Sequence, residues 1–173
     1  LVRLLDAAGC RVQQRLWHVA AEGRPPWFLR RNHGHETALL RLGRTVRAPM
    51  HLPLFPHGHG PEATEHAIRC TLGHLYDLDP AVDAIHAISD PRAWVVAEAW
   101  LRLGRDPDHL RCVGYDRHSA RLIPGSWRPW ATVEKDNRDL AIRAVARLSE
   151  RLAGAAARSR PILIAPRVVQ GAG

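Results

Sequence analysis

Residues 91–123, PRAWVVAEAWLRLGRDPDHLRCVGYDRHSARLI, contain the clearest helix of the sequence and, after it, the clearest change to a β pattern. The helix carries apolar residues at three- and four-residue spacing, which is typical of one face buried against a core. Ser89 or Asp90 caps its start, Pro91 lies near its first position, and Gly104 ends it. The apolar stripe consists of Ala93, Val96, Ala97, Trp100 and Leu101.

Two short β segments follow this helix, at residues 111–115 and 119–123. They are separated by Asp116, Arg117 and His118, a polar trio that suits a turn. Two such segments joined by a short polar turn predict an antiparallel hairpin.

Helical periodicity dominates the rest of the chain. Further helices are predicted over residues 2–22, 61–77, 80–88 and 132–153, with one or two helical turns over 36–42. In the longest helix the residues predicted to face inward are Leu140, Ala141, Ala144, Val145, Leu148 and Leu152.

The fold class follows from these elements. Residues 27–29 indicate a short strand, and residues 45–55, which contain two prolines, indicate an extended edge segment or a loop instead of a central strand. We predict an α+β fold that is helix-dominated, with about five helices and a small antiparallel hairpin or sheet. Residues 1–154 are predicted to form a single compact domain, and residues 155–173 a C-terminal linker or tail with a short apolar strand.

The chain is strongly basic. Its 173 residues carry a formal net charge of +8 and a pI near 10.8, and Lys135 is the single lysine among 25 basic residues. An arginine excess suits phosphate binding because a guanidinium can donate two parallel hydrogen bonds to phosphate oxygens. A GC-rich genome explains the same excess, since it favours arginine together with alanine, glycine and proline, so both explanations stay open.

Cysteine content and hydropathy indicate the cellular compartment. Three cysteines, far apart and odd in number, do not indicate a disulfide framework and are typical of a reducing cytosol. No apolar run approaches the roughly eighteen residues of a membrane helix, and the N-terminal residues are too polar for a secretory signal. We therefore expect a cytoplasmic protein without a membrane partner.

A cluster of histidines and one cysteine predicts a zinc site. His66, Cys70 and His74 recur every four residues and so share one face of the helix predicted over 61–77. His59, with His57 as its alternative, lies in the glycine-rich loop before that helix. These four residues supply the nitrogen and sulfur ligands of a tetrahedral zinc ion.

A zinc ion at this cluster would be structural if all four positions were filled. If one position were open to water the site would be hydrolytic, with Glu62 or Glu65 as the base. The alternative is that Cys70 belongs to the buried face of the helix, because a buried cysteine behaves as a small hydrophobe.

Two other groups resemble catalytic pairs. Residues 30–36, RRNHGHE, place two histidines close to Glu36, and zinc deaminases use a histidine ligand and an acid–base glutamate in an HxE pattern. The rest of that signature is missing, so we interpret this segment as an exposed polar turn. Cys112 with His109 or His118 could form a nucleophile and base, but its β segment favours a core position for the thiol.

An arginine face indicates phosphate binding. Arg143, Arg147 and Arg151 are spaced by four along one face of the helix predicted over 132–153, a row of charge that could lie along a phosphate backbone. The alternative is a solvated helix face, because Asp139 lies four residues before Arg143 and can pair with it.

Trp127 and Trp130 flank Arg128 in a loop before that helix. Aromatic side chains interleaved with arginine stack on single-stranded nucleic acid or on a partner peptide. The alternative, which the residue type favours, is that these rings plug the loop onto the core.

The leading hypothesis is a small basic domain that binds nucleic acid or another polyanion. Its predicted contacts are Arg143, Arg147, Arg151, Trp127, Arg128 and Trp130. One alternative is a zinc-binding protein, a metal-dependent hydrolase if a coordination position is open, with zinc as the one cofactor the pattern supports. Another is a protein–protein interaction module whose charge reflects genome composition. Enzymatic activity and oligomeric state stay undecided.

Overall fold

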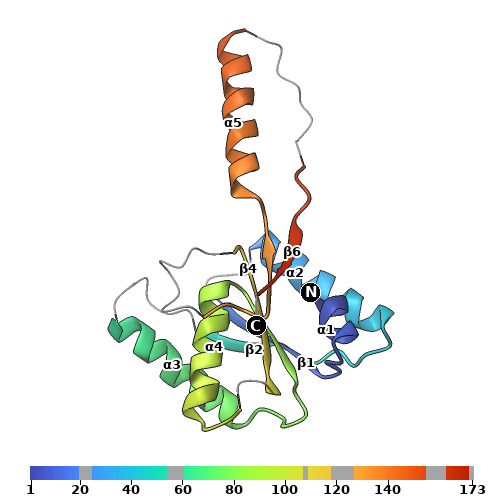
Figure 1. Ribbon diagram of the computed structural model, residues 1–173, viewed down its shortest axis with the longest axis vertical. Helices are drawn as coiled ribbons and strands as arrows, with labels where there is room; N and C mark the ends of the chain where they lie inside the picture. Colours follow the sequence, from blue (N-terminus) through green and yellow to red (C-terminus); the bar gives the residue numbers. More distant parts are fainter. Residues whose placement is uncertain (20–24, 54–60, 107–108, 118–126, 155–162, 172–173) are drawn as a thin grey trace.

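A six-stranded β-sheet forms the centre of the molecule (Figure 1). The computed structural model describes residues 1–19, 25–53, 61–106, 109–117, 127–154 and 163–171. The strands are β1 (Gln13–Val19), β2 (Met50–Pro53), β3 (Ala84–Ala87), β4 (Arg111–Tyr115), β5 (Ala131–Glu134) and β6 (Arg167–Gln170). Their order is β2-β1-β3-β4-β5-β6; the first five are parallel, and β6 is antiparallel to β5.

Helices join the parallel strands and cover both faces of the sheet. They are α1 (Val2–Ala7), α2 (Pro26–Arg41), α3 (Pro61–Tyr76), α4 (Asp90–Arg102) and α5 (Asn137–Leu152). Parallel neighbours need crossover connections, which α2, α3 and α4 provide. Crossover connections are right-handed, and after β2 the chain adds its next strands on the other side of β1. For this reason α2 lies with α1 on one face of the sheet, and α3 lies with α4 on the other (Figure 1).

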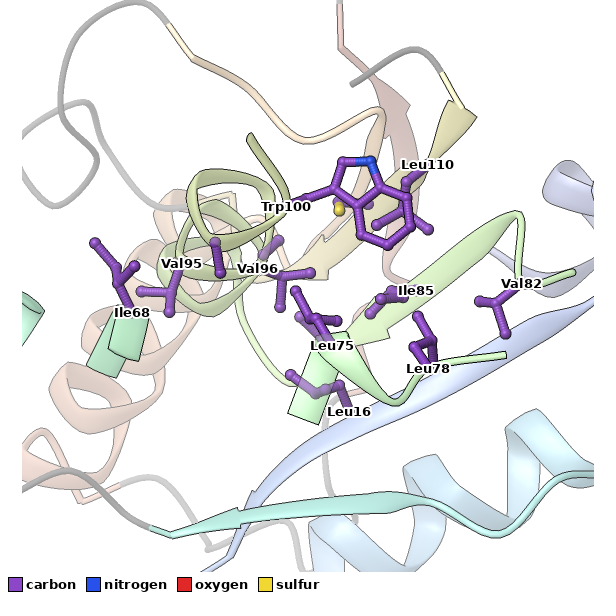
Figure 2. Packing of buried hydrophobic residues seen from close by; sticks show 14 of the residues in the cluster. Leu16, Ile68, Leu75, Leu78, Val82, Ile85, Val95, Val96, Trp100 and Leu110 are labelled. Carbon is purple, nitrogen blue, oxygen red and sulfur yellow. The ribbon is translucent and has the colours of Figure 1, made fainter. Parts of the chain in front are cut away.

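The main hydrophobic core lies between the sheet and the α3–α4 layer. Figure 2 shows Leu75 of α3, Trp100 of α4 and Ile85 of β3 in one cluster. Each is at most 6% exposed, and burying an aliphatic side chain of this size contributes about 1.5–3 kcal/mol. The Trp100 indole nitrogen donates to the Asp106 carbonyl at 2.8 Å, so its polar atom is satisfied.

The central strands are buried on both faces. In β3, Ile85 belongs to the main core and Ala84 to a second cluster on the opposite face. In β4, Cys112 and Val113 divide in the same way. Strands of a parallel sheet therefore carry apolar residues at consecutive positions instead of alternating with polar ones.

The prediction of a helix-dominated α+β fold with a small antiparallel hairpin is wrong. The molecule is an α/β fold of the Rossmann-like kind, with a mostly parallel sheet at its centre. The predicted hairpin cannot use β4, because β3 and β5 occupy both of its edges in parallel. Residues 119–123, its predicted second strand, lie outside the described residues.

Several predictions of individual helices, strands and turns are also wrong. The helix predicted over 2–22 ends at Ala7, and β1 occupies its second half. The helix predicted over 80–88 contains β3, which is buried on both faces and so has no alternation to identify it. The strand predicted at 27–29 and the turn predicted at 30–36 are both parts of α2, which begins with a proline at its first turn.

Other elements are confirmed. α3, α4 and β4 agree with their predicted spans to within a residue or so, and β2 is an edge strand as its prolines indicate. β6 falls within the segment predicted as a tail, where it pairs with β5 as the last strand of the sheet.

Helix α5 stands away from the sheet (Figure 1). It has no buried residue, so the prediction that its apolar stripe faces inward is wrong: Leu148 is 57% and Leu152 80% exposed. An amphipathic pattern indicates a face suited to burial, whereas the layer that would bury it is a property of the whole fold. Within the described residues, no helix is long and apolar enough to cross a membrane.

Candidate small-molecule site at the carboxyl edge of the sheet

The topology of the sheet indicates where a ligand would bind. β2 lies on one side of β1, while β3, β4 and β5 follow on the other, so the direction of winding reverses between β1 and β3. In open α/β sheets, ligands bind at this reversal, outside the carboxyl ends of the strands. Arg31 of α2, Ile88 just after β3 and Asp116 just after β4 meet at this edge, which we call the carboxyl-edge site.

Arg31 of α2 is the centre of the carboxyl-edge site. Its Nη1 donates to the Ile88 carbonyl at 2.9 Å, just after β3, and its Nη2 lies 3.5 Å from Asp116 Oδ1, just after β4. Its guanidinium carbon lies 4.9 Å from the ring centre of Trp27 and 4.4 Å from that of Tyr115. These rings and hydrogen bonds orient the guanidinium, and at 22% exposure it still reaches solvent.

The backbone at the end of β4 is strained. Asp116 has φ 86° and Arg117 φ 41°, values that L-residues other than glycine rarely adopt. Such a conformation costs about 1–3 kcal/mol and persists where the surroundings enforce it. Here the Asp116 amide donates to the Val133 carbonyl at 2.8 Å, and Asp116 Oδ1 lies 2.7 Å from Lys135 Nζ. These contacts keep the strained backbone in place, and the Asp116 carboxylate lies between the cations of Lys135 and Arg31.

A buried contact fixes the strands beneath Asp116. Asp90, at the start of α4, is 2% exposed and accepts from the Thr132 hydroxyl at 2.7 Å. Gly114 permits this approach, since a Cβ there would lie 2.3 Å from Asp90 Oδ1 and 2.9 Å from its Cα and amide nitrogen. The contact ties β4, α4 and β5 together at the site.

A buried polar cluster fixes α2 against β1. Arg15 of β1 is 2% exposed and donates to Glu36 Oε1 at 2.6 Å and also to the Asn32 side chain. The hydrogen bond from Arg15 is the largest cause that lowers the pKa of the Glu36 carboxyl. Because Asn32 is adjacent to Arg31 in α2, this cluster also positions the guanidinium of the site.

Two histidines complete this cluster. The rings of His35 and His86 lie 4.3 Å apart at 83°, and His86 Nε2 is 2.9 Å from Gln13 Oε1. Burial lowers the pKa of His35 to about 3 and that of His86 well below its ordinary value. Both rings are therefore neutral at pH 7, and His35 is a buried helical residue instead of part of an exposed turn.

The predicted zinc ligands are brought together in part. Cys70 Sγ and His66 Nε2 lie 3.5 Å apart on α3, and His74 is exposed one turn further along. His59 lies outside the described residues. Among the residues that the structure describes, no three His, Cys, Asp or Glu side chains gather as a metal site, so zinc binding stays a prediction. Of the two proposed bases, Glu65 is hydrogen-bonded to Arg102 at 2.8 Å.

The predicted nucleic-acid residues lie on two parts of the molecule. Arg143 and Arg151 are exposed on α5, Arg147 is half-buried there, and Arg143 donates to Asp139 at 2.8 Å. No surface complementary to nucleic acid is defined by this helix, and its role stays a prediction.

The two tryptophans contact the sheet layers. Trp127 is half-buried against the main core and Trp130 against the second cluster, with the Arg111 guanidinium 5.1 Å from its ring centre. Arg128 is exposed and donates to the Trp127 carbonyl at 2.7 Å. This placement agrees with the core-packing alternative.

Cys112 is a core residue, as its β segment indicates. It is 5% exposed in β4, and burial raises the pKa of its thiol to about 12, so it cannot serve as a thiolate nucleophile at pH 7. His109 is exposed and pairs with Asp106 at 3.0 Å, while His118 and Ser119 lie outside the described residues.

No protein-family model and no curated protein matches the sequence. The structure is similar to a putative transcriptional regulator of the LacI family from Sanguibacter keddieii, with a TM-score of 0.69 and 23% identity over 99% of this chain and 60% of that one. A LacI-family transcriptional regulator from Lactobacillus casei with bound sucrose gives a TM-score of 0.70 and 17% identity over 99% of this chain and 60% of that one. The Lac repressor dimer bound to operator gives a TM-score of 0.68 and 21% identity over 98% of this chain and 54% of that one.

The similarity shows the fold. Identity of 17–23% carries no further statement about this chain, which spans 54–60% of the length of these three structures.

Arg31, Asp116 and Lys135 are site residues that the sequence alone does not indicate. The sequence pattern predicts a hairpin turn at Asp116 and a polar turn at Arg31. The missing signal was the parallel character of the strands, since a charged residue directly after a buried parallel strand lies at the ligand-binding edge.

Proposed function

We propose that this chain binds a small molecule at the carboxyl-edge site and serves as the ligand-binding part of a transcription regulator. The Arg31–Asp116 pair across the reversal of the sheet carries the proposal, because α2 and β4 place opposite charges together where this fold binds ligands. The regulator role is supported by the fold shared with LacI-family regulators, one bound to sucrose and one to operator DNA.

The chemistry of the site suits a polar ring compound. Arg31 supplies hydrogen-bond donors and Asp116 acceptors, and Trp27, which is 48% exposed, supplies an apolar ring face. A few convergent polar groups beside aromatic surface are the usual composition of a small-molecule site.

Thermal unfolding in the presence of a panel of mono- and disaccharides and their phosphates and acids tests the proposal. A ligand present at a hundred times its Kd stabilises the fold by about 2.7 kcal/mol, which raises Tm by about 5–11 °C for a chain of this size. Arg31→Gln, which removes the guanidinium at the centre of the site and keeps a polar side chain, should abolish that shift. Arg69→Gln, on a side chain 70% exposed on α3, is the matched control and should keep it.

The proposal is refuted if no compound of the panel raises Tm, or if Arg31→Gln responds as the wild type does. Circular dichroism of each variant confirms that the fold is intact before ligand is added.

We also propose nucleic-acid binding through α5, since Arg143 and Arg151 lie on a helix with no buried residue and the chain carries a charge of +8. Retention on heparin that is lost at moderate salt, and lost when Arg143, Arg147 and Arg151 are changed to Gln, would support it. Retention by the triple variant equal to that of the wild type would contradict it.

Zinc binding is a further proposal, supported by the His66–Cys70 contact. Elemental analysis of tag-free protein should find about one zinc per chain, and Cys70→Ser should lose it. Metal-free protein that keeps its fold in chelator would contradict the proposal.

A further inference from the structure

We propose that the carboxyl-edge site selects a small ligand that bears an anionic group, a phosphate or a carboxylate, over the neutral counterpart of the same ligand. The inference rests on the proposed function and names the ligand class of that site. Its basis is the distribution of charge around Asp116.

Asp116 is shared by two cations. Its Oδ1 lies 2.7 Å from Lys135 Nζ and 3.5 Å from Arg31 Nη2. One carboxylate cannot neutralise both, so this trio keeps an excess positive charge. All three side chains remain partly exposed, at 45% for Lys135, 22% for Arg31 and 21% for Asp116, so a ligand can reach them.

The neighbouring charges do not cancel this excess. Glu134 is also shared by two cations, since its Oε2 lies 2.9 Å from Arg117 Nη1 and 3.0 Å from Arg167 Nε. Arg167 also lies 3.6 Å from Asp136, which leaves this second group balanced.

The start of α4 adds one charge of each sign. Asp90 is buried and hydrogen-bonded to Thr132, whereas Arg92, in the first turn of the helix, stays cationic at pH 7 although burial lowers its pKa to about 10. The N-termini of α2 and α4 lie at the same edge, where their dipoles favour negative charge.

The geometry at Arg31 favours an anion over a hydroxyl group. A charge-assisted N–H···O contact is about 2.7–2.9 Å long, so the 3.5 Å approach of Asp116 does not saturate the guanidinium. A hydroxyl group of a neutral sugar that donates to the Asp116 carboxylate would have to compete with Lys135, whose Nζ already lies 2.7 Å from Asp116 Oδ1. A phosphate or carboxylate instead adds the negative charge that Arg31 and Lys135 together lack, and it can accept two parallel hydrogen bonds from the arginine.

Matched ligands test the inference. Titration calorimetry at low salt with glucose, glucose 6-phosphate and gluconate, and with the same three forms of galactose, compares the neutral, phosphate and carboxylate forms of two sugars. We expect at least one anionic form to bind about tenfold or more tightly than its neutral parent, and the difference to shrink as salt is raised. The phosphate and acid arms identify which anion is preferred.

Two variants assign the selectivity. Lys135→Gln should remove most of the preference for the anionic form while the neutral form binds as before or better, because Asp116 is then released. Arg69→Gln removes the same charge from the outer surface of α3 and should leave the preference intact.

The outcomes separate the inference from the proposed function. Neutral sugars that bind as tightly as their anionic forms would overturn the inference and leave the proposed function standing. An anionic preference unchanged in Lys135→Gln would overturn the assignment to this site. If no form of either sugar binds and the wider panel raises no Tm, both proposals fail.

Discussion

Gly114 should be among the least replaceable residues of the fold. A Cβ at this position would lie 2.3 Å from Asp90 Oδ1 and 2.9 Å from the Asp90 Cα and amide nitrogen. Overpacking of this kind costs about 1–3 kcal/mol, and loss of the buried Thr132–Asp90 hydrogen bond adds about 1.5–3 kcal/mol. Since both result from one displacement, we expect Gly114→Ala to lower the free energy of unfolding by about 3 kcal/mol and Tm by about 6–12 °C.

Urea denaturation followed by circular dichroism measures this loss, with an unchanged m-value as the sign that only stability has changed. Gly73→Ala is the matched control, because Gly73 lies in α3 and a Cβ there would have no other atom within 4 Å. That substitution should raise stability by about 0.5–1 kcal/mol through helix propensity.

A double variant distinguishes overlap of the new Cβ with the Asp90 backbone from overlap with the Asp90 side chain. Asp90→Ala removes the Oδ1 contact but not the Cα and amide contacts at 2.9 Å, so it should not rescue Gly114→Ala. A Gly114→Ala protein with the wild-type urea midpoint, or one restored by Asp90→Ala, would refute the argument that the backbones of β4 and α4 meet at this glycine.

Three further predictions follow from burial. Burial lowers the pKa of His35 to about 3 and that of His86 well below its ordinary value, so below about pH 6.5 the unfolded chain binds two protons that the fold excludes. Each histidine then lowers the free energy of unfolding by about 1.4 kcal/mol per pH unit, and His35→Leu should remove one of these two contributions from urea midpoints compared at pH 7.5 and pH 5. Burial raises the pKa of Cys112 to about 12, so a thiol reagent should label the partly exposed Cys70 in native protein and Cys112 only after denaturation. Leu75→Ala should cost about 2–5 kcal/mol in the same denaturation assay, because the side chain is fully buried.

The elements that could be predicted from sequence are those with local signals. Pro61 and Glu62 mark the start of α3, and Asp90 with Pro91 marks that of α4, so the predicted starts of both helices agree with the structure. Prolines identified the region of β2 as an edge. These signals act within one turn or one strand and do not depend on the rest of the chain.

The sheet could not be predicted in the same way. β3 has the burial pattern of a strand covered on both faces, and its four residues, AIHA, are equally compatible with a helix. β1 follows Gly9, where a φ of 93° separates it from α1, yet its residues continue an apparent helical period. Because these two strands were not predicted, the parallel order of the sheet could not be predicted either. The edge of the sheet where Arg31 meets Asp116 depends on that order.

Helix α5 shows how far local information extends. The Asp136 side chain accepts from the Asp139 amide at 3.1 Å, and Arg143 pairs with Asp139 at 2.8 Å, contacts that contribute about 0.5–2 and 0.3–0.5 kcal/mol respectively. These local interactions mark the helix from Asn137 on, whereas residues 132–134, predicted as its first turn, belong to β5. Its apolar stripe, by contrast, has the pattern of a core face but no buried residue. If Leu148 and Leu152 were assumed to be buried because of the pattern, the free energy of unfolding would be overestimated by about 1.5–3 kcal/mol for each side chain. Periodicity specifies a helix and the face it offers, while burial depends on segments distant in the sequence.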